Sequence, residues 1–104
     1  MQELDPTAAR ARLAADDPPV LLDVRERWEV ETASIDGALH VPMADIPAAL
    51  GALPNDRAII VFCHHGGRSH TAAQLLARAG FEVMNLAGGI DAWSREVDPA
   101  VPTY

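Results

Sequence analysis

Residues 58–69 read Ala-Ile-Ile-Val-Phe-Cys-His-His-Gly-Gly-Arg-Ser, and this stretch decides the fold. Its first five residues are apolar and β-branched in the middle, which predicts a strand covered on both faces. After the glycines, apolar residues at 72, 75, 76 and 79 follow the spacing of one helical face, and Gly80 is placed to end that helix. A buried strand that leads through a glycine loop into an amphipathic helix is typical of an α/β domain.

The segments on either side alternate in the same way, which predicts one α/β unit with a parallel sheet over residues 1–104. The predicted strands are residues 20–24, 39–41, 58–62 and 83–86. The predicted helices are residues 5–15, a short exposed helix or turn at 25–32, then 45–53, 69–79 and 90–95. The tail from residue 97 contains two prolines and is expected to lie over the surface.

The composition excludes several classes of function. Hydrophobic residues make up 49% of the chain and charged residues 22%, which is a globular composition. Fifteen acidic residues against eight basic ones give a formal charge of -7, so neither general nucleic-acid binding nor binding to an anionic membrane is expected. Every basic residue is arginine, which excludes Schiff-base and lysine general-base chemistry.

Cys63 is the only cysteine of the sequence. A single thiol excludes an intramolecular disulfide, a C-x-x-C redox pair and a multi-cysteine zinc site. The first residues show neither a basic start nor an apolar run, and no apolar stretch approaches the length of a membrane span. We therefore expect a cytoplasmic protein.

The loop at 63–69 is the candidate active site. Gly66 and Gly67 allow the backbone to curl so that successive N–H groups point inward, and the following helix N-terminus adds partial positive charge. Arg68 adds a full charge with a geometry suited to oxyanions, so the loop is expected to be locally positive. Cys63 at the mouth of such a nest should have a lowered pKa and react as a thiolate. The alternative is an inert core cysteine, since free cysteines are often buried after apolar strands.

The histidines allow a second interpretation. His64 and His65 could bind a metal together with Cys63 and His70, but no carboxylate or second cysteine is spaced to complete the shell. We instead expect His64 and His65 to line the mouth of the pocket, and no metal or other cofactor to be bound. Ser69 is expected to be the N-cap of the helix, and His70 an exposed residue of its first turn. His40 lies on a short apolar strand and is expected to be structural.

Four groups of residues, in order along the chain, resemble the single-domain rhodanese family of sulfurtransferases. They are Leu21-Leu22-Asp23-Val24-Arg25-Glu26 with Trp28-Glu29, Ile35-Asp36-Gly37-Ala38-Leu39-His40-Val41-Pro42, the loop from Cys63 to Ser69, and Gly80-Phe81, Asn85-Leu86, Gly88-Gly89-Ile90 and Ala92-Trp93. The second group departs from the family in one place, since Ala33-Ser34 stand where many members have Gly-His. Together the groups cover nearly the whole chain as one rhodanese-like domain.

The resemblance implies a parallel sheet of about five strands with helices on both faces. It implies that Cys63 carries a persulfide, and that donor and persulfide are bound by His64, His65, Gly66, Gly67, Arg68 and Ser69. Asp23 and Arg25 are interpreted as a structural ion pair. The implied reaction moves sulfane sulfur from thiosulfate, or a related small anionic donor, to a thiophilic acceptor, which is cyanide in vitro and a thiol or a protein in the cell.

Loop length separates this reaction from a related one. Four residues lie between Cys63 and Arg68, whereas similar phosphatases and arsenate reductases have five, which widens the cradle for a tetrahedral oxyanion. Sulfur transfer is therefore favoured over phosphatase or arsenate reductase activity. The same loop could also belong to a non-enzymatic binding or sulfur-sensing module, or hold a peroxide-sensing thiol. A monomer is expected.

Overall fold

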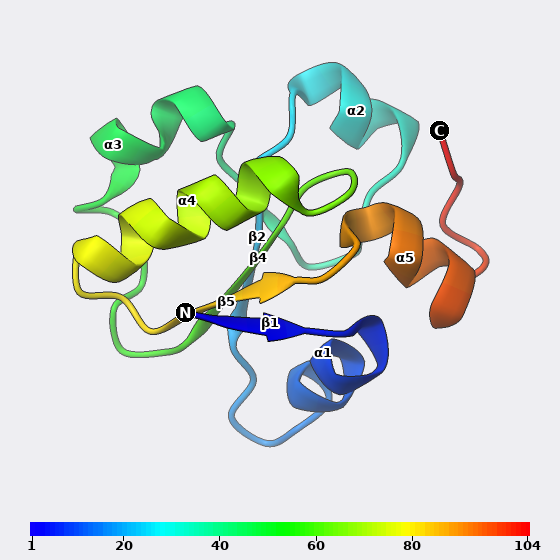
Figure 1. Ribbon diagram of the computed structural model, residues 1–104, viewed down its shortest axis with the longest axis horizontal. Coiled ribbons are helices and arrows are strands. Elements are labelled where there is room, and N and C mark those ends of the chain that lie inside the picture. The colour runs from blue at the N-terminus through cyan, green and yellow to red at the C-terminus, as the bar shows by residue number, and fades with distance from the viewer.

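Five short strands form a parallel sheet at the centre of the protein, in a computed structural model that describes all 104 residues (Figure 1). The strands are β1 (Gln2–Leu4), β2 (Val20–Asp23), β3 (Leu39–His40), β4 (Ile59–Phe62) and β5 (Val83–Leu86). Their order across the sheet is β1-β5-β4-β2-β3, and every neighbouring pair is parallel. The predicted α/β class with a parallel sheet is confirmed.

The buried strands are the ones that their apolar sequences predicted. Every residue of β2, β4 and β5 is buried, because helices cover both faces of these three strands. The sequence pattern predicted no strand at the N-terminus, where β1 pairs with β5 at the edge of the sheet. Only one of its three residues, Leu4, is buried, so β1 carries no apolar pattern that could have predicted it.

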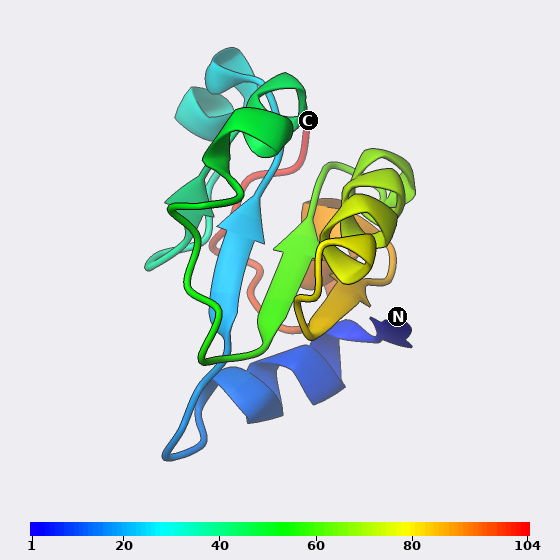
Figure 2. The same cartoon turned by 90° about the vertical axis from the view of Figure 1, so that its left-hand side faces the viewer.

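Helices cover both faces of the sheet, and the sheet divides the core into two layers (Figures 1 and 2). The helices are α1 (Pro6–Leu13), α2 (Arg27–Thr32), α3 (Ile46–Ala49), α4 (Gly67–Arg78) and α5 (Gly89–Glu96), and a 3-10 turn, η1 (Met43–Asp45), precedes α3. Ile60, Phe62 and Trp93 belong to the layer under α1 and α5. Ile59, Val61 and Leu76 belong to the layer under α3 and α4.

The helix predicted over residues 45–53 is much shorter in the structure. It consists of η1 and the four residues of α3, although Ile46 and Leu53 are buried as the apolar spacing predicted. Gly51 lies where the helix would have to continue, and glycine is a poor helix former. The other helices lie close to their predicted ranges, and none of the helices is long and apolar enough to cross a membrane.

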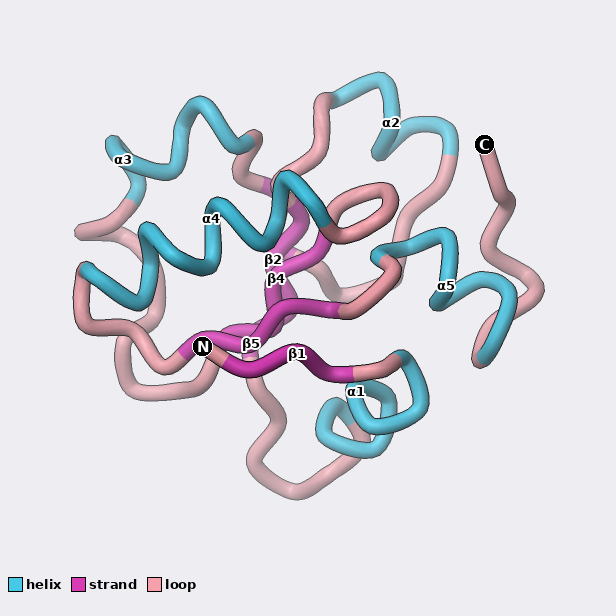
Figure 3. Tube along the Cα trace, viewed as in Figure 1, coloured by secondary structure: helices cyan, strands magenta, loops and turns pink.

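The C-terminal tail packs more deeply than its prolines predicted. Val101 is buried in the layer under α5, where its carbonyl accepts a hydrogen bond from the Ser94 hydroxyl. Tyr104 then lies beside α2, with its ring edge-on to Trp28 at a centroid distance of 5.9 Å. The tail, coloured pink in Figure 3 beyond α5, therefore joins α5 to α2.

Candidate active site

The loop from Cys63 to Gly66 begins at the carboxyl end of β4 and runs directly into α4. The carboxyl edge of a parallel sheet is where α/β proteins place ligands. Gly66 turns the chain with φ +108, and a Cβ there would lie 3.4 Å from the Gly88 nitrogen and close to Leu86. Gly66 is also the N-cap residue of α4, so the prediction of Ser69 as N-cap was wrong. The left-handed turn starts the helix earlier and places Ser69 inside its first turn.

The N-terminus of α5 is hydrogen-bonded to the backbone of this loop. The Ile90 amide donates to the Cys63 carbonyl at 2.9 Å, and the Asp91 amide donates to the His64 carbonyl at 3.1 Å. This approach needs glycine at position 89, which has φ +62 and whose Cβ would lie 2.5 Å from the Cys63 oxygen. Because the His64 carbonyl faces α5, the His65 amide that follows it is free to face the sulfur.

The Cys63 sulfur lies in a nest of hydrogen-bond donors. The Gly66 amide donates to Sγ at 3.1 Å. Burial opposes ionisation of the thiol, but bonds from the Ser69 hydroxyl and from the Ser69, Gly66 and His65 amides outweigh burial and lower the pKa of Cys63 below its ordinary value. The residue is only 1% exposed, and none of the surface cavities is lined by a residue of this loop. The site therefore favours the thiolate form of Cys63. Because the residue is buried, only a small donor could reach its sulfur.

The Ser69 hydroxyl has one proton and three acceptors within reach. They are Cys63 Sγ at 3.4 Å, the Gly66 carbonyl at 3.3 Å and Asn85 Oδ1 at 2.6 Å. Asn85 is held in this orientation because its Nδ2 donates to both carboxylate oxygens of Glu3, at 3.1 and 3.0 Å. The shortest of these contacts indicates that the Ser69 hydroxyl proton is donated mainly to Asn85 Oδ1. The backbone amides, which have no competing acceptor, are therefore the more constant donors to the Cys63 sulfur.

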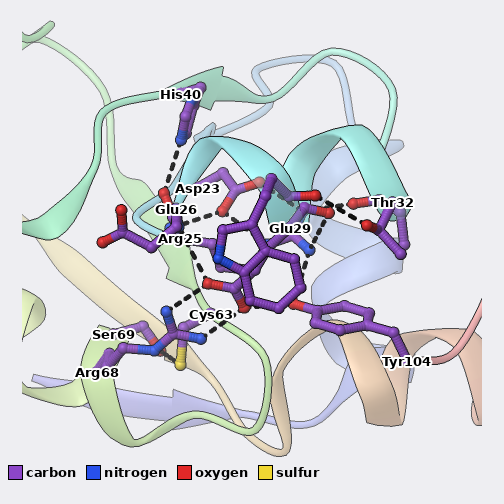
Figure 4. Close-up of polar contacts among 12 residues, drawn as sticks. Asp23, Arg25, Glu26, Glu29, Thr32, His40, Cys63, Arg68, Ser69 and Tyr104 are labelled. Carbon is purple, nitrogen blue, oxygen red and sulfur yellow. Dashed lines mark hydrogen bonds and ion pairs between the residues drawn. The ribbon is translucent and has the colours of Figure 1, made fainter.

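Arg68 forms an ion pair with Glu29 of α2 (Figure 4). Its two terminal nitrogens donate to the two carboxylate oxygens at 2.6 and 2.8 Å. Hydrogen bonds from Arg68, and then from Tyr104, hold the pKa of Glu29 at about 2 despite its burial, so Glu29 is charged at neutral pH. The sequence predicted a locally positive loop. The structure corrects the contribution of Arg68, because a buried carboxylate from a distant helix offsets its charge, whereas the amide donors around Cys63 are present as expected.

Asp23 and Arg25 form the structural ion pair that the sequence predicted. The Arg25 guanidinium is fully buried and donates to both Asp23 oxygens, at 2.9 and 2.7 Å. It also donates to the Ala33 carbonyl at 2.7 Å and to the Tyr104 hydroxyl at 2.9 Å. His40 is structural as expected, with its Nε2 2.7 Å from the Arg25 carbonyl oxygen. These contacts tie β2, α2 and the tail together beside the loop.

The side chains of His64 and His65, in the middle of the loop, form one wall of the site. Their rings stack at a centroid distance of 3.8 Å, and Tyr104 stacks on the other face of His64 at 3.9 Å. Asp91, to which the sequence assigned no role, brings a carboxylate so near that possible ligand atoms of the three residues lie within 4.8 Å of one another. However, stacked imidazoles do not aim their lone pairs at one point, and Asp91 already accepts a bond from Arg95 at 3.0 Å. This arrangement suits a packed wall better than a metal shell.

The remaining predicted residues, Gly67 and His70, lie in α4, directly after the loop. Gly67 begins α4, and His70 is exposed in its first turn as expected, 3.1 Å from Glu3. Asn85 and Glu29 were predicted only as members of motifs, with no role of their own, and Tyr104 was not predicted at all. Asn85 could have been noticed as the one polar side chain in an apolar strand. Nothing in the sequence connects Tyr104 to this site.

Comparisons with known proteins agree with the fold. The model of the rhodanese-like domain matches residues 5–96. A sulfurtransferase of Allochromatium vinosum is 36% identical over 102 residues, covering 97% of this chain and 95% of that one. The putative sulfurtransferase YtwF of Bacillus subtilis is 34% identical over 99 residues, covering 95% and 96%. The crystal structure of a rhodanese-related protein from Thermoplasma volcanium superposes with a TM-score of 0.88 at 27% identity, covering 100% of both chains. Sulfur transfer is thereby supported at the level of the family.

Proposed function

Because the chain belongs to the rhodanese-like domain family, we propose that it is a sulfurtransferase that carries sulfane sulfur on Cys63 as a persulfide. One observation carries the proposal: the Cys63 sulfur accepts a bond from the Gly66 amide at 3.1 Å, within a nest that lowers the pKa of the thiol. A buried structural cysteine would have a raised pKa and no such donors.

The first half of the reaction loads the sulfur. The Cys63 thiolate attacks the outer sulfur of a donor such as thiosulfate, and the bond between the two donor sulfurs breaks. Its electron pair leaves with sulfite, so a thiolate and a dianion become a persulfide anion and a sulfite dianion. Arg68 and the amides of Gly66 and Gly67 are the groups that would bind the donor.

The loaded state keeps its negative charge next to the same donors. The amides of His65, Gly66 and Ser69 already stabilise the charged form of Cys63, and they would stabilise the persulfide in the same way. We propose that the side chains of His64 and His65 line the space around the persulfide. No second cysteine is present to attack the persulfide, so the acceptor comes from outside: a thiol, a protein or, in the laboratory, cyanide.

Steady-state formation of thiocyanate from thiosulfate and cyanide tests the proposal. Reciprocal plots at several cyanide concentrations should give parallel lines, because each substrate reacts with a different form of the enzyme. The Cys63→Ser variant, shown to be folded by circular dichroism, should form no thiocyanate. Turnover that persists in this variant would contradict the role of Cys63.

A further inference from the structure

The arginine of the active-site loop is matched by a carboxylate that the loop does not contain. Glu29 comes from α2, is 3% exposed, and receives both terminal nitrogens of Arg68 (Figure 4). Bidentate pairing fixes the guanidinium in one plane and one position. Tyr104 donates to Glu29 Oε2 at 2.6 Å and so holds the carboxylate from its other side. The pair is therefore built into the site and is not a chance contact between surface side chains.

No free positive charge remains among the arginines around the sulfur. Arg25 is neutralised by Asp23, and Arg95, at the far end of the His64 wall, is paired with Asp91. Arg68 has its own partner in Glu29. An incoming donor meets the thiolate, the uncharged amide donors of the nest and neutral ion pairs, on a protein whose formal charge is -7. Each additional negative charge on the donor then costs binding energy that an unpaired arginine would have offset.

We infer that Glu29 determines the charge class of the donor, so that the site prefers sulfane-sulfur donors with one negative charge to the dianion thiosulfate. The inference rests on the proposed function and narrows its substrate. Glu29 acts through Arg68 and is a positioning residue. Alkanethiosulfonates, and persulfides of small thiols that carry no further net charge, belong to the preferred class.

Methanethiosulfonate is the matched probe, because it differs from thiosulfate chiefly in charge. The Cys63 thiolate attacks its outer sulfur, the S–S bond breaks, and the electron pair leaves with methanesulfinate. The product is the same Cys63 persulfide that thiosulfate gives with loss of sulfite. The measured quantity is the second-order rate constant of persulfide loading for each donor, in a single turnover without acceptor, and the ratio of the two constants.

Glu29→Gln removes the charge and keeps the size of the side chain. We expect the thiosulfate-to-methanethiosulfonate ratio to rise at least about fivefold, which is the effect of one unit charge on one additional donor charge about 4 Å away even when it is screened as strongly as in bulk water. Glu29→Asp disturbs the bidentate geometry but keeps the charge, so its ratio should stay near that of the wild type. Glu31→Gln makes the same charge change on the same helix, at an exposed residue paired with Arg27, and should leave the ratio within about twofold.

The outcomes separate the inference from the proposed function. An unchanged or lower ratio in Glu29→Gln, or an equal rise in Glu31→Gln, would overturn the inference while loading itself stands. If neither donor loads the wild-type protein, the proposed function fails and the inference with it. If Glu29→Gln does not fold, the reference is a small free thiolate that reacts with the same two donors. The thiosulfate-to-methanethiosulfonate ratio of the wild-type protein is then compared with the ratio for this thiolate. A wild-type ratio above this reference would show that a free cation acts in the site, and would overturn the inference.

Discussion

Gly89→Ala should damage the active site although residue 89 carries no side chain and takes no part in the chemistry. A Cβ at this position would lie 2.5 Å from the Cys63 oxygen and would also overlap the His64 carbonyl. Neither backbone group can rotate away, because both carbonyls accept hydrogen bonds from the amides of Ile90 and Asp91. The loop or the start of α5 must therefore shift.

The expected loss of stability has two parts. A non-glycine residue in the left-handed region costs about 1–2 kcal/mol, partly offset by about 0.5 kcal/mol from the smaller entropy of the unfolded chain. Overlap with packed backbone adds about 1–3 kcal/mol. The free energy of unfolding of Gly89→Ala should thus fall by about 2–4 kcal/mol, measured by urea denaturation.

Gly80→Ala is the matched control. Gly80 has φ +97, less favourable for alanine than the φ of +62 at Gly89, but its Cβ would meet no atom within 4 Å. We expect a loss of about 1–2 kcal/mol at this position, since only the backbone cost remains. The difference between the two variants isolates the contact between α5 and the loop.

The rate of Cys63 alkylation by iodoacetamide as a function of pH reports whether the loop has moved. A shift of the loop lengthens the 3.1 Å bond from the Gly66 amide to Sγ and weakens the nest that lowers the pKa of Cys63. The pKa should therefore rise in Gly89→Ala and stay at the wild-type value in Gly80→Ala. Equal losses of stability in the two variants, with the same thiol pKa, would refute the reasoning.

Three further variants test the polar contacts around the loop. Arg68→Ala should slow loading by thiosulfate about tenfold and loading by methanethiosulfonate less, because it removes a positive charge and exposes the donor to Glu29; equal losses would argue against an electrostatic role. The pKa of Glu29 is lowered from 4.5 to about 2 by folding, so its contribution to stability is present above about pH 4.5 and is lost as the pH falls toward 2. Partial exposure of Arg68 limits this contribution to on the order of 2 kcal/mol, and urea denaturation between pH 6 and pH 3 should show a smaller loss in Glu29→Gln than in the wild type. Tyr104→Phe keeps the ring on His64 but removes the hydroxyl between Arg25 and Glu29, and should lower the free energy of unfolding by about 1–2 kcal/mol; unchanged thermal unfolding would show that the tail does not support the site.

The buried part of the fold follows from local sequence patterns. The strands β2, β4 and β5 are nearly continuous apolar runs, and α4 has a clear apolar face. Short stretches of sequence therefore suffice to predict these elements and their order along the chain. β1 has no such pattern, because an edge strand of three residues needs only backbone pairing with β5. Its presence depends on the rest of the sheet.

The candidate site likewise has a part that local sequence predicts and a part that depends on distant residues. The loop around Cys63 is contiguous, so its residue types already indicate a nest that stabilises a thiolate. The partners that set its charge come from 39 residues away, in the case of Glu29 and Arg68, and from 75 residues away, in the case of Tyr104 and Glu29. No periodicity or motif spacing connects such positions. A net charge counted within the loop therefore overstated the positive field that a donor meets.

The most direct test of the central claim is the intact mass of the protein after incubation with thiosulfate or methanethiosulfonate, and again after cyanide. We predict that the wild-type protein gains the mass of one sulfur atom, that cyanide removes it with release of thiocyanate, and that Cys63→Ser gains nothing. A wild-type protein that stays at its original mass with both donors, or a Cys63→Ser variant that gains sulfur, would contradict the proposal that Cys63 carries the transferred sulfur.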